Sequence, residues 1–163
     1  MTERFDMTAA STLQCLVYVS KIAGSGLNNL RPTVRNILTQ AQHRNARDHV
    51  TGLLVFNNSF FAQALEGEPN AVERTFGRIS KDVRHTLPTI LLKQTISERA
   101  FGAWTMCARQ LSVLDNDILN SLEKRGAFPP GYGSGAQLLT QLQAIGRVHS
   151  AAFDRQSKDV HYL

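Results

Sequence analysis

The residues best suited to chemistry in this chain are polar and aromatic side chains set inside apolar stretches. Gln63 is an amide within the segment FFAQALEG, and Tyr18 is a phenol within LVYVS. A buried amide needs partners for its carbonyl oxygen and for its two amide hydrogens. A phenol can donate a proton, and it can also supply an electron to an oxidant. Each residue taken alone could still be an ordinary core residue, since buried aromatic side chains usually serve packing.

Other candidates also have ordinary explanations when they are taken singly. Trp104 and Met106 share one face of a predicted strand, where both are typical packing residues. Asn45 ends a predicted helix, a position that asparagine favours for local reasons. Arg78 and Asp82 are four residues apart on another predicted helix and form a pair typical of solvated helix faces. None of these residues demands a ligand by itself.

The elements that must position these residues follow from the hydrophobic pattern. Strands are predicted over residues 13–20, 50–57, 59–67, 89–96 and 103–108. One helix is predicted from about Pro32 to residue 45, and a second from Pro69 through Val83, with His85 near its end. The order β-α-β-β-α-β-β indicates an α+β, ferredoxin-like sheet with one extra strand and both helices on one face. The crossover through the first helix should be right-handed if the two strands that it joins are parallel.

Strand alternation then assigns side chains to faces. In the third strand, Gln63 points to the same side as Phe61 and Leu65, while Ala62 and Ala64 point to the other side. The small alanine side chains leave room for close packing on their own face. In the first strand, Tyr18 shares a face with Leu16 and Ser20.

The remaining chain divides into a leader and an extension. Residues 1–11 are expected to be a flexible leader, residues 12–110 the main domain, and residues 111–163 a helical extension. Within the extension, apolar residues at helical spacing over 114–125 and 137–150 flank a Gly/Pro-rich loop. We expect a helical hairpin that packs on the free sheet face or on a partner.

Composition narrows the function classes. Among 163 residues the net charge is +5, and the basic residues are spread over the two predicted helices, which could grip phosphates between them. The two cysteines lie in apolar stretches, and no metal-ligand spacing is present. Neither a signal peptide nor a membrane-spanning run is visible. These features predict a cytoplasmic protein without a metal site.

The combined pattern closely resembles one family. The motifs are LVYVSK, N-x5-TGLL from Asn45 to Leu54, FFAQALEGE, R-x3-D-x2-H from Arg78 to His85, and ERAFGAWTM. In this order they resemble the BLUF family of blue-light sensors that use flavin adenine dinucleotide (FAD). The resemblance covers about residues 14–108. The chain departs from it at Arg44, where members often carry His or Asn, and at Val19, where serine is frequent.

The resemblance implies a role for each candidate residue. Tyr18 and Gln63 would be the photoactive pair, with Tyr18 giving an electron and a proton and Gln63 rotating or tautomerising to red-shift the flavin absorption. Trp104 and Met106 would neighbour Gln63. The remaining flavin contacts would be Asn45 at the pyrimidine edge, Asp82 at the ribityl chain or ring edge, Arg78 on the phosphate side, His85 near the flavin edge and Ile37 as an apolar wall.

The resemblance also implies a photoreceptor rather than an enzyme, acting on a separate protein. A bacterial cyclic-nucleotide enzyme or a transcription regulator is expected as that partner, and the chain is expected to form a homo-oligomer, a dimer or larger. Two alternatives stay open. A flavin-dependent or acyl-phosphate enzyme could share the fold, although no Gly-rich phosphate loop or nucleophile–base pair is present. A nucleic-acid-binding module would fit the charge, although the aromatic pattern of sheet-face RNA binders is missing.

Overall fold

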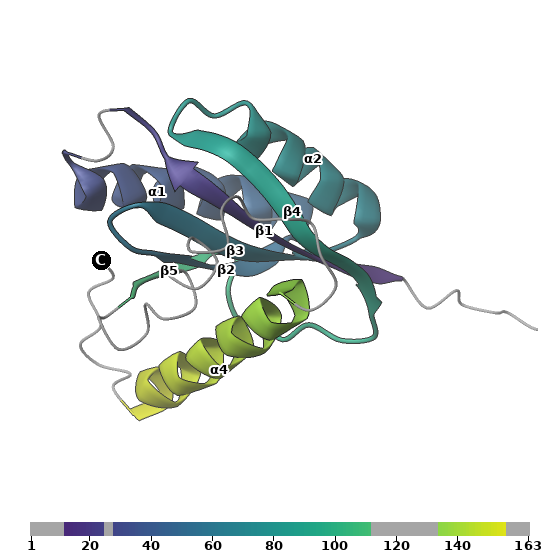
Figure 1. Ribbon diagram of the computed structural model, residues 1–163. Coiled ribbons are helices and arrows are strands. Elements are labelled where there is room, and N and C mark those ends of the chain that lie inside the picture. Colours follow the sequence, from purple (N-terminus) through teal and green to yellow (C-terminus); the bar gives the residue numbers. More distant parts are fainter. Residues whose placement is uncertain (1–11, 25–27, 112–133, 156–163) are drawn as a thin grey trace, which may run out of the picture.

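The computed structural model describes residues 12–24, 28–111 and 134–155 (Figure 1). The chain runs through β1 (Leu13–Ile22), α1 (Leu30–Asp48), β2 (Thr51–Phe56), β3 (Phe60–Gly67), α2 (Pro69–Ser80), β4 (His85–Ile96), β5 (Cys107–Gln110) and α4 (Ser134–Arg155). The predicted leader and the predicted helix over 114–125 lie outside the described residues. None of the described helices is long and apolar enough to cross a lipid bilayer.

The five strands form one sheet in the order β4-β1-β3-β2-β5. β1 and β2 both run antiparallel to β3, and β5 alone pairs in parallel with its neighbour β2. This is the predicted ferredoxin-like arrangement with the extra strand added at the edge beside β2. The hairpin between β2 and β3 is also as predicted: Asn57 Oδ1 accepts the N–H groups of Ser59 (2.8 Å) and Phe60 (2.7 Å).

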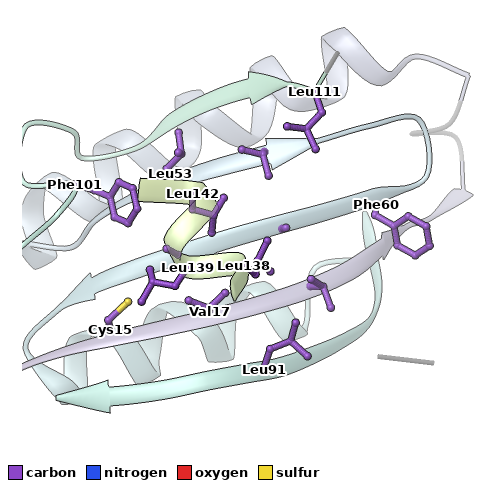
Figure 2. Packing of buried hydrophobic residues seen from close by; sticks show 14 of the residues in the cluster. Cys15, Val17, Leu53, Phe60, Leu91, Phe101, Leu111, Leu138, Leu139 and Leu142 are labelled. Atoms are coloured by element: carbon purple, nitrogen blue, oxygen red, sulfur yellow. The ribbon is translucent and has the colours of Figure 1, made fainter. Parts of the chain in front are cut away.

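The sheet separates two hydrophobic cores, one on each face. The first, the α1/α2 core, joins one set of strand residues to the two helices; it includes Leu16, Tyr18, Val34, Leu38, Leu54, Phe61, Leu65, Val72 and Met106. The second, the α4 core, lies on the other face (Figure 2); it includes Cys15, Val17, Val19, Leu53, Ala62, Ala64, Phe101, Leu138, Leu139 and Leu142. The face assignments within β3 are therefore correct, and the free sheet face is covered by α4.

Close approach of α4 to the sheet depends on small residues. An added Cβ at Gly135 would lie 2.3 Å from the carbonyl oxygen of Leu91 in β4. Because that neighbour is backbone, it cannot move aside as a flexible side chain would. Ala62 and Ala64 keep the same face of β3 flat beneath the helix. The room that the alanine pattern predicted is used by this helix.

The end of α2 differs from the prediction. The helix stops at Ser80, Val83 is 88% exposed, and His85 already belongs to β4. Asp82 explains the early stop, because its side chain accepts the backbone N–H of Arg84 and its carbonyl accepts that of His85. Such local side-chain bonds compete with helix continuation. α1 differs in the opposite sense, since it continues past Asn45 to Asp48.

The fifth strand also differs from the prediction. It comprises Cys107–Gln110 rather than residues 103–108. Residues 97–106, which we call the β4–β5 loop, turn where the N–H of Trp104 donates to the carbonyl of Phe101 (3.0 Å). Trp104 and Met106 therefore precede the strand, and strand alternation does not govern where their side chains point.

Candidate functional site

A cleft lies on the helix-bearing face of the sheet, between α1 and α2. It encloses about 570 Å³ of space between atoms, part of it open to solvent. Its lining includes eight of the nine residues singled out from the sequence: Tyr18, Ile37, Asn45, Gln63, Arg78, Asp82, His85 and Met106. The ninth, Trp104, does not line it. The fold thus gathers residues that lie far apart in the sequence at one place.

At the floor of the cleft a phenol, an amide and a thioether form a chain of hydrogen bonds. Tyr18 on β1 lies directly opposite Gln63 on β3 in the antiparallel register. The Tyr18 hydroxyl donates to Gln63 Oε1 (2.5 Å), and Gln63 Nε2 donates to Met106 Sδ (2.9 Å). Burial, with a smaller contribution from the charge of Asp82, raises the pKa of Tyr18 far above its usual value. The phenol is therefore neutral and serves as a donor.

Trp104 and Met106 lie on opposite faces of the sheet, which corrects the prediction that they share one. Met106 belongs to the α1/α2 core, whereas Trp104 packs against the α4 core with its ring 6.4 Å from that of Phe101. An added Cβ at Gly146 of α4 would lie 3.2 Å from the Trp104 ring. The β4–β5 loop therefore contacts the cleft with one side chain and α4 with another.

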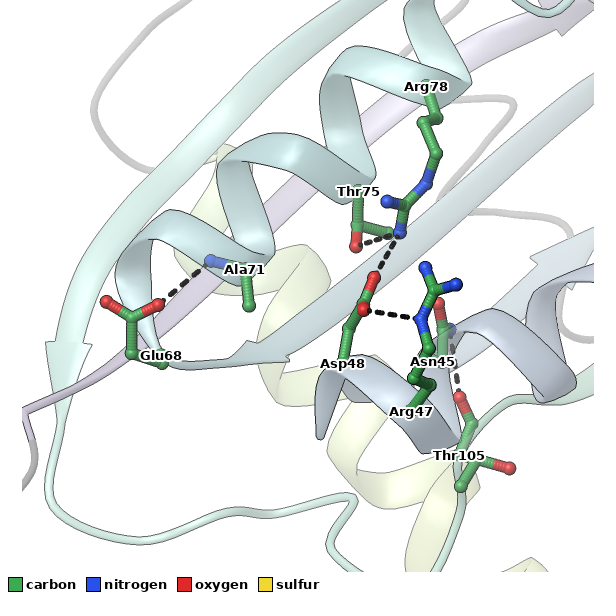
Figure 3. A network of polar contacts seen from close by, with 8 residues as sticks. All are labelled: Asn45, Arg47, Asp48, Glu68, Ala71, Thr75, Arg78 and Thr105. Carbon is green, nitrogen blue, oxygen red and sulfur yellow. Dashed lines mark hydrogen bonds and ion pairs between the residues drawn. The ribbon is translucent and has the colours of Figure 1, made fainter.

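The last turns of α1 hold the end of this loop. Asn45 is buried, and its Nδ2 donates to the carbonyl of Thr105 (2.9 Å; Figure 3). One turn earlier, Gln42 Nε2 donates to the carbonyl of Met106 (3.0 Å). Sequence reasoning missed Gln42, because a glutamine on an exposed helix face carries no local signal of a long-range contact.

His85 closes the cleft beside β1. Its Nδ1 shares a hydrogen bond of 2.8 Å with Ser20 Oγ, and its ring centre is 4.8 Å from that of Phe61. Burial is the largest influence on its pKa and lowers it to about 4, with Asp82 opposing and Arg84 assisting. The imidazole is neutral at pH 7, so the Ser20 contact is a neutral hydrogen bond.

The mouth of the cleft carries arginine side chains. Arg78 donates to Asp48 Oδ2 (3.0 Å) and to Thr75 Oγ1 (2.9 Å), which ties α2 to the end of α1 (Figure 3). The Arg78–Asp82 pair predicted from their spacing is therefore wrong, since Asp82 lies beyond the helix and pairs with Arg84 instead (Nε to Oδ1, 2.8 Å). Hydrogen bonds from Arg84 hold the pKa of Asp82 below its usual range.

Several lining residues were not assigned to the site from the sequence. Arg84 Nη2 also donates to Gln40 Oε1 on α1 (3.1 Å), so it bridges the two sides of the mouth. The others include the apolar Ala41, Leu54 and Ile79, and the polar Arg44 and Thr75. Ala41 and Ile79 lie at apolar helical spacing in the sequence, but such periodicity marks a buried face without separating core contacts from a cleft wall.

The donor set fits a planar ligand that bears an anionic tail. Ile37, Leu54 and Ile79 offer apolar walls, while the amides of Asn45 and Gln63 offer hydrogen bonds at an edge. The guanidinium groups lining the mouth suit phosphate oxygens (Arg44, Arg78 and Arg84). Within the described ranges, no three His, Cys, Asp or Glu side chains gather as metal ligands would. Fold and site together define a ferredoxin-like protein with a cleft, between the two helices on its sheet, that suits a flavin-like cofactor.

Comparison with known proteins identifies the family. A family model described as "Sensors of blue-light using FAD" matches residues 13–107, more than half of the chain. The chain therefore belongs to the BLUF family, and the matched residues form a flavin-binding blue-light sensor rather than an enzyme. This confirms the family, the fold class and the sensory function expected from the sequence.

Individual relatives agree with the family assignment. The chain is 33% identical over 127 residues to the photoactivated adenylate cyclase subunit beta of Euglena longa, covering 72% of this chain but 14% of that protein. It is 32% identical over 129 residues to the blue light- and temperature-regulated antirepressor BluF of Escherichia coli, covering 77% and 32%. The dark-state structure of the BLUF protein BlrB superposes with a TM-score of 0.67 at 26% identity, covering 83% and 98%. This chain thus spans only a small part of the length of the curated relatives.

Proposed function

We propose that the chain is a blue-light photoreceptor in which Tyr18 and Gln63 generate the signal and Met106 receives it. The observation that carries the proposal is the hydrogen-bond chain from Tyr18 through Gln63 to Met106, buried at the floor of the cleft. A bound flavin supplies absorption of blue light and, when excited, an acceptor for an electron. Tyr18 is the donor of that electron and of its hydroxyl proton, and it regains both afterwards.

Gln63 can respond to electron and proton transfer from Tyr18 because the two ends of its amide differ. In the structure its oxygen faces a phenol donor and its nitrogen faces a thioether acceptor. A thioether sulfur has no proton to donate. If the amide rotates, its oxygen faces Sδ and the bond to Met106 is lost, while its nitrogen faces the Tyr18 hydroxyl. Rotation or tautomerisation at Gln63 therefore changes what holds Met106, and the β4–β5 loop carries that change towards Trp104 and α4.

We further propose that the flavin is FAD. Arg44, Arg78 and Arg84 line the cleft and offer several N–H donors, which suit the larger set of phosphate oxygens on FAD. Asn45 would hold the pyrimidine edge, Ile37 would wall the ring, and Asp82 and His85 would lie near the ribityl chain and ring edge. Binding of FAD and FMN, compared by titration with the wild type and with Arg44→Gln, tests this: only a loss of preference for FAD in the variant agrees with the assignment.

We also propose that residues 12–110 make the signal and residues 111–163 pass it to a separate protein in the cytoplasm. One similar protein is named an adenylate cyclase subunit and another an antirepressor. Those names support a cyclic-nucleotide enzyme or a transcription regulator as the partner. A homo-oligomeric receptor, a dimer or larger, is part of the same proposal.

The central test is the light-induced absorption change. The purified, flavin-loaded protein should show a small reversible red shift of its flavin band under blue light. Tyr18→Phe and Gln63→Leu should bind flavin and lose the shift, because one removes the phenol proton and the other both amide ends. Gln94→Leu, the same change on an exposed part of β4, is the matched control and should keep the shift. A normal shift in either site variant would remove that residue from the mechanism.

A further inference from the structure

Glu66 is a buried carboxylate that the photochemistry does not use. It lies three residues after Gln63 on β3, points to the opposite sheet face and is only 1% exposed. Its two oxygens accept the backbone N–H groups of Ala100 and Phe101, each at 2.9 Å. Hydrogen bonds to an ionised acceptor are stronger than neutral ones. Glu66 therefore binds the first part of the β4–β5 loop to the strand that carries Gln63.

Arg99 strengthens the same attachment from outside. Its Nη1 donates to the Glu66 carbonyl (2.8 Å) and to Thr51 Oγ1 (2.9 Å), and its Nη2 donates to the His49 carbonyl (2.7 Å). Thr51 in turn donates to Glu66 Oε2 (3.4 Å). These contacts attach residues 99–101 to the β2–β3 pair and to the residue that follows α1. We call the set of Thr51, Glu66 and Arg99 the loop anchor.

The far end of the loop is held differently. Its side-chain contact is the Met106 Sδ bond to Gln63, and its backbone carbonyls accept Asn45 and Gln42. Between the two ends, the Trp104 carbonyl accepts the N–H of Gly52 at 3.2 Å. The loop is thus firmly fixed at residues 99–101, while the photoactive glutamine is one of the groups that hold its other end.

We propose that Glu66 is a positioning residue of the photosensor, which holds the base of the β4–β5 loop so that release of Met106 displaces Trp104 against α4. This inference rests on the proposed function. With the base fixed, a change at Met106 is confined to residues 102–106. Trp104 lies within that span and contacts α4 at Gly146. With the base released, the same change would be absorbed by movement of the whole loop, and the Trp104 ring would already vary in the dark.

The experiment uses Trp104 as the reporter, because it is the only tryptophan in the chain. Acrylamide quenching of its fluorescence is measured in the dark and under steady blue light, together with the flavin shift, on the full-length loaded protein. Glu66→Gln keeps the side-chain size but turns one acceptor into a donor facing a backbone N–H. The loss of about one strong hydrogen bond should reduce the light–dark difference in quenching at least threefold, with the flavin shift retained.

Two further variants complete the test. Glu68→Gln is the matched control, since Glu68 also accepts a backbone N–H (Ala71, 3.1 Å) but caps α2 away from the loop; it should keep the wild-type difference. Arg99→Lys weakens the loop anchor without altering the buried carboxylate, and it should also reduce the light–dark difference in quenching. It therefore serves as the test if Glu66→Gln does not fold. Absence of the flavin shift in the wild type would overturn the proposed function. A normal shift with an unreduced quenching difference in the anchor variants would overturn the anchor alone.

Discussion

The amide of Gln63 lies between two partners that favour one of its two rotational orientations. The Met106 sulfur can only accept, so it favours the amide nitrogen, and the Tyr18 hydroxyl, which can donate or accept, then donates to the amide oxygen. This single preferred orientation makes the dark arrangement a defined starting point. A hydrogen bond contributes only about 1 kcal/mol net, so a change here shifts the populations of two loop arrangements and does not unfold the domain.

His85 should make stability depend on pH. Its pKa of about 4 in the folded protein lies below the 6.5 of an unperturbed histidine. Between those values the unfolded chain binds a proton that the folded protein does not, so lowering the pH should reduce the free energy of unfolding, by on the order of 3 kcal/mol in full. Urea unfolding at pH 7 and pH 4.5 measures this. His85→Gln should lose that part of the pH dependence, whereas His43→Gln, at an exposed position on α1, should retain it.

At the level of residues, the sequence predicted the residues that line the cleft better than the residues that hold the β4–β5 loop in place. An amide and a phenol inside apolar strands stand out because their polar groups must be satisfied, and both lie at the floor of the cleft. Glu66 did not stand out, because a glutamate near a strand end is usually exposed. Its partners Ala100 and Phe101 are 34 and 35 residues away. Contacts at that separation leave no trace in local periodicity.

Among the elements, α4 is the one that covers the second face of the sheet. Its buried leucines pack on the face that carries the small alanines of β3 (Figure 2). The predicted helix over 137–150 is therefore confirmed as part of a longer one and lies on the sheet. Two of the bounds that the sequence placed wrongly are the end of α2 and the start of β5. The first is set by hydrogen bonds of Asp82 and the second follows the turn at Trp104, and hydrophobic patterns register neither.

Packing of α4 should contribute measurably to stability. Leu142 is fully buried against the sheet, whereas Val148 on the same helix is 64% exposed. Leu142→Ala should lower the free energy of unfolding by about 2–5 kcal/mol through lost burial and an unfilled cavity. Val148→Ala should change it by less than about 0.5 kcal/mol. Equal, small effects of the two substitutions in denaturant titrations would show that α4 is not docked on the sheet in solution.

For the whole molecule, the central fact is that the cleft and α4 lie on opposite faces of one sheet. The cleft with Tyr18 and Gln63 is on the α1/α2 side, and α4 covers the other side (Figure 1). The β4–β5 loop reaches both, through Met106 and Trp104. A signal therefore has a short route around the edge of the sheet and need not pass through its hydrogen-bonded strands.

Removal of the extension after Leu111 should separate light sensing from signal output. A chain ending at Leu111 keeps every residue that lines the cleft but uncovers the α4 core, including Val17, Val19 and Leu53. We expect the light-induced flavin shift to survive at low temperature, while the midpoint of thermal unfolding falls and self-association increases, because a large apolar face is exposed. Absorption spectroscopy, thermal melts and light scattering measure the three effects. Loss of the shift in a folded truncated protein would place the extension within the photosensor.

The separation of the two cores by the sheet also affects how such a chain can diversify. Side chains that point away from the cleft can change with whatever lies on them, and the light-absorbing half need not adjust. Related chains could replace the covering helix, and with it the protein that receives the signal, while they keep the same light-absorbing half. Only the β4–β5 loop, which serves both halves, would have to keep its sequence under two sets of demands.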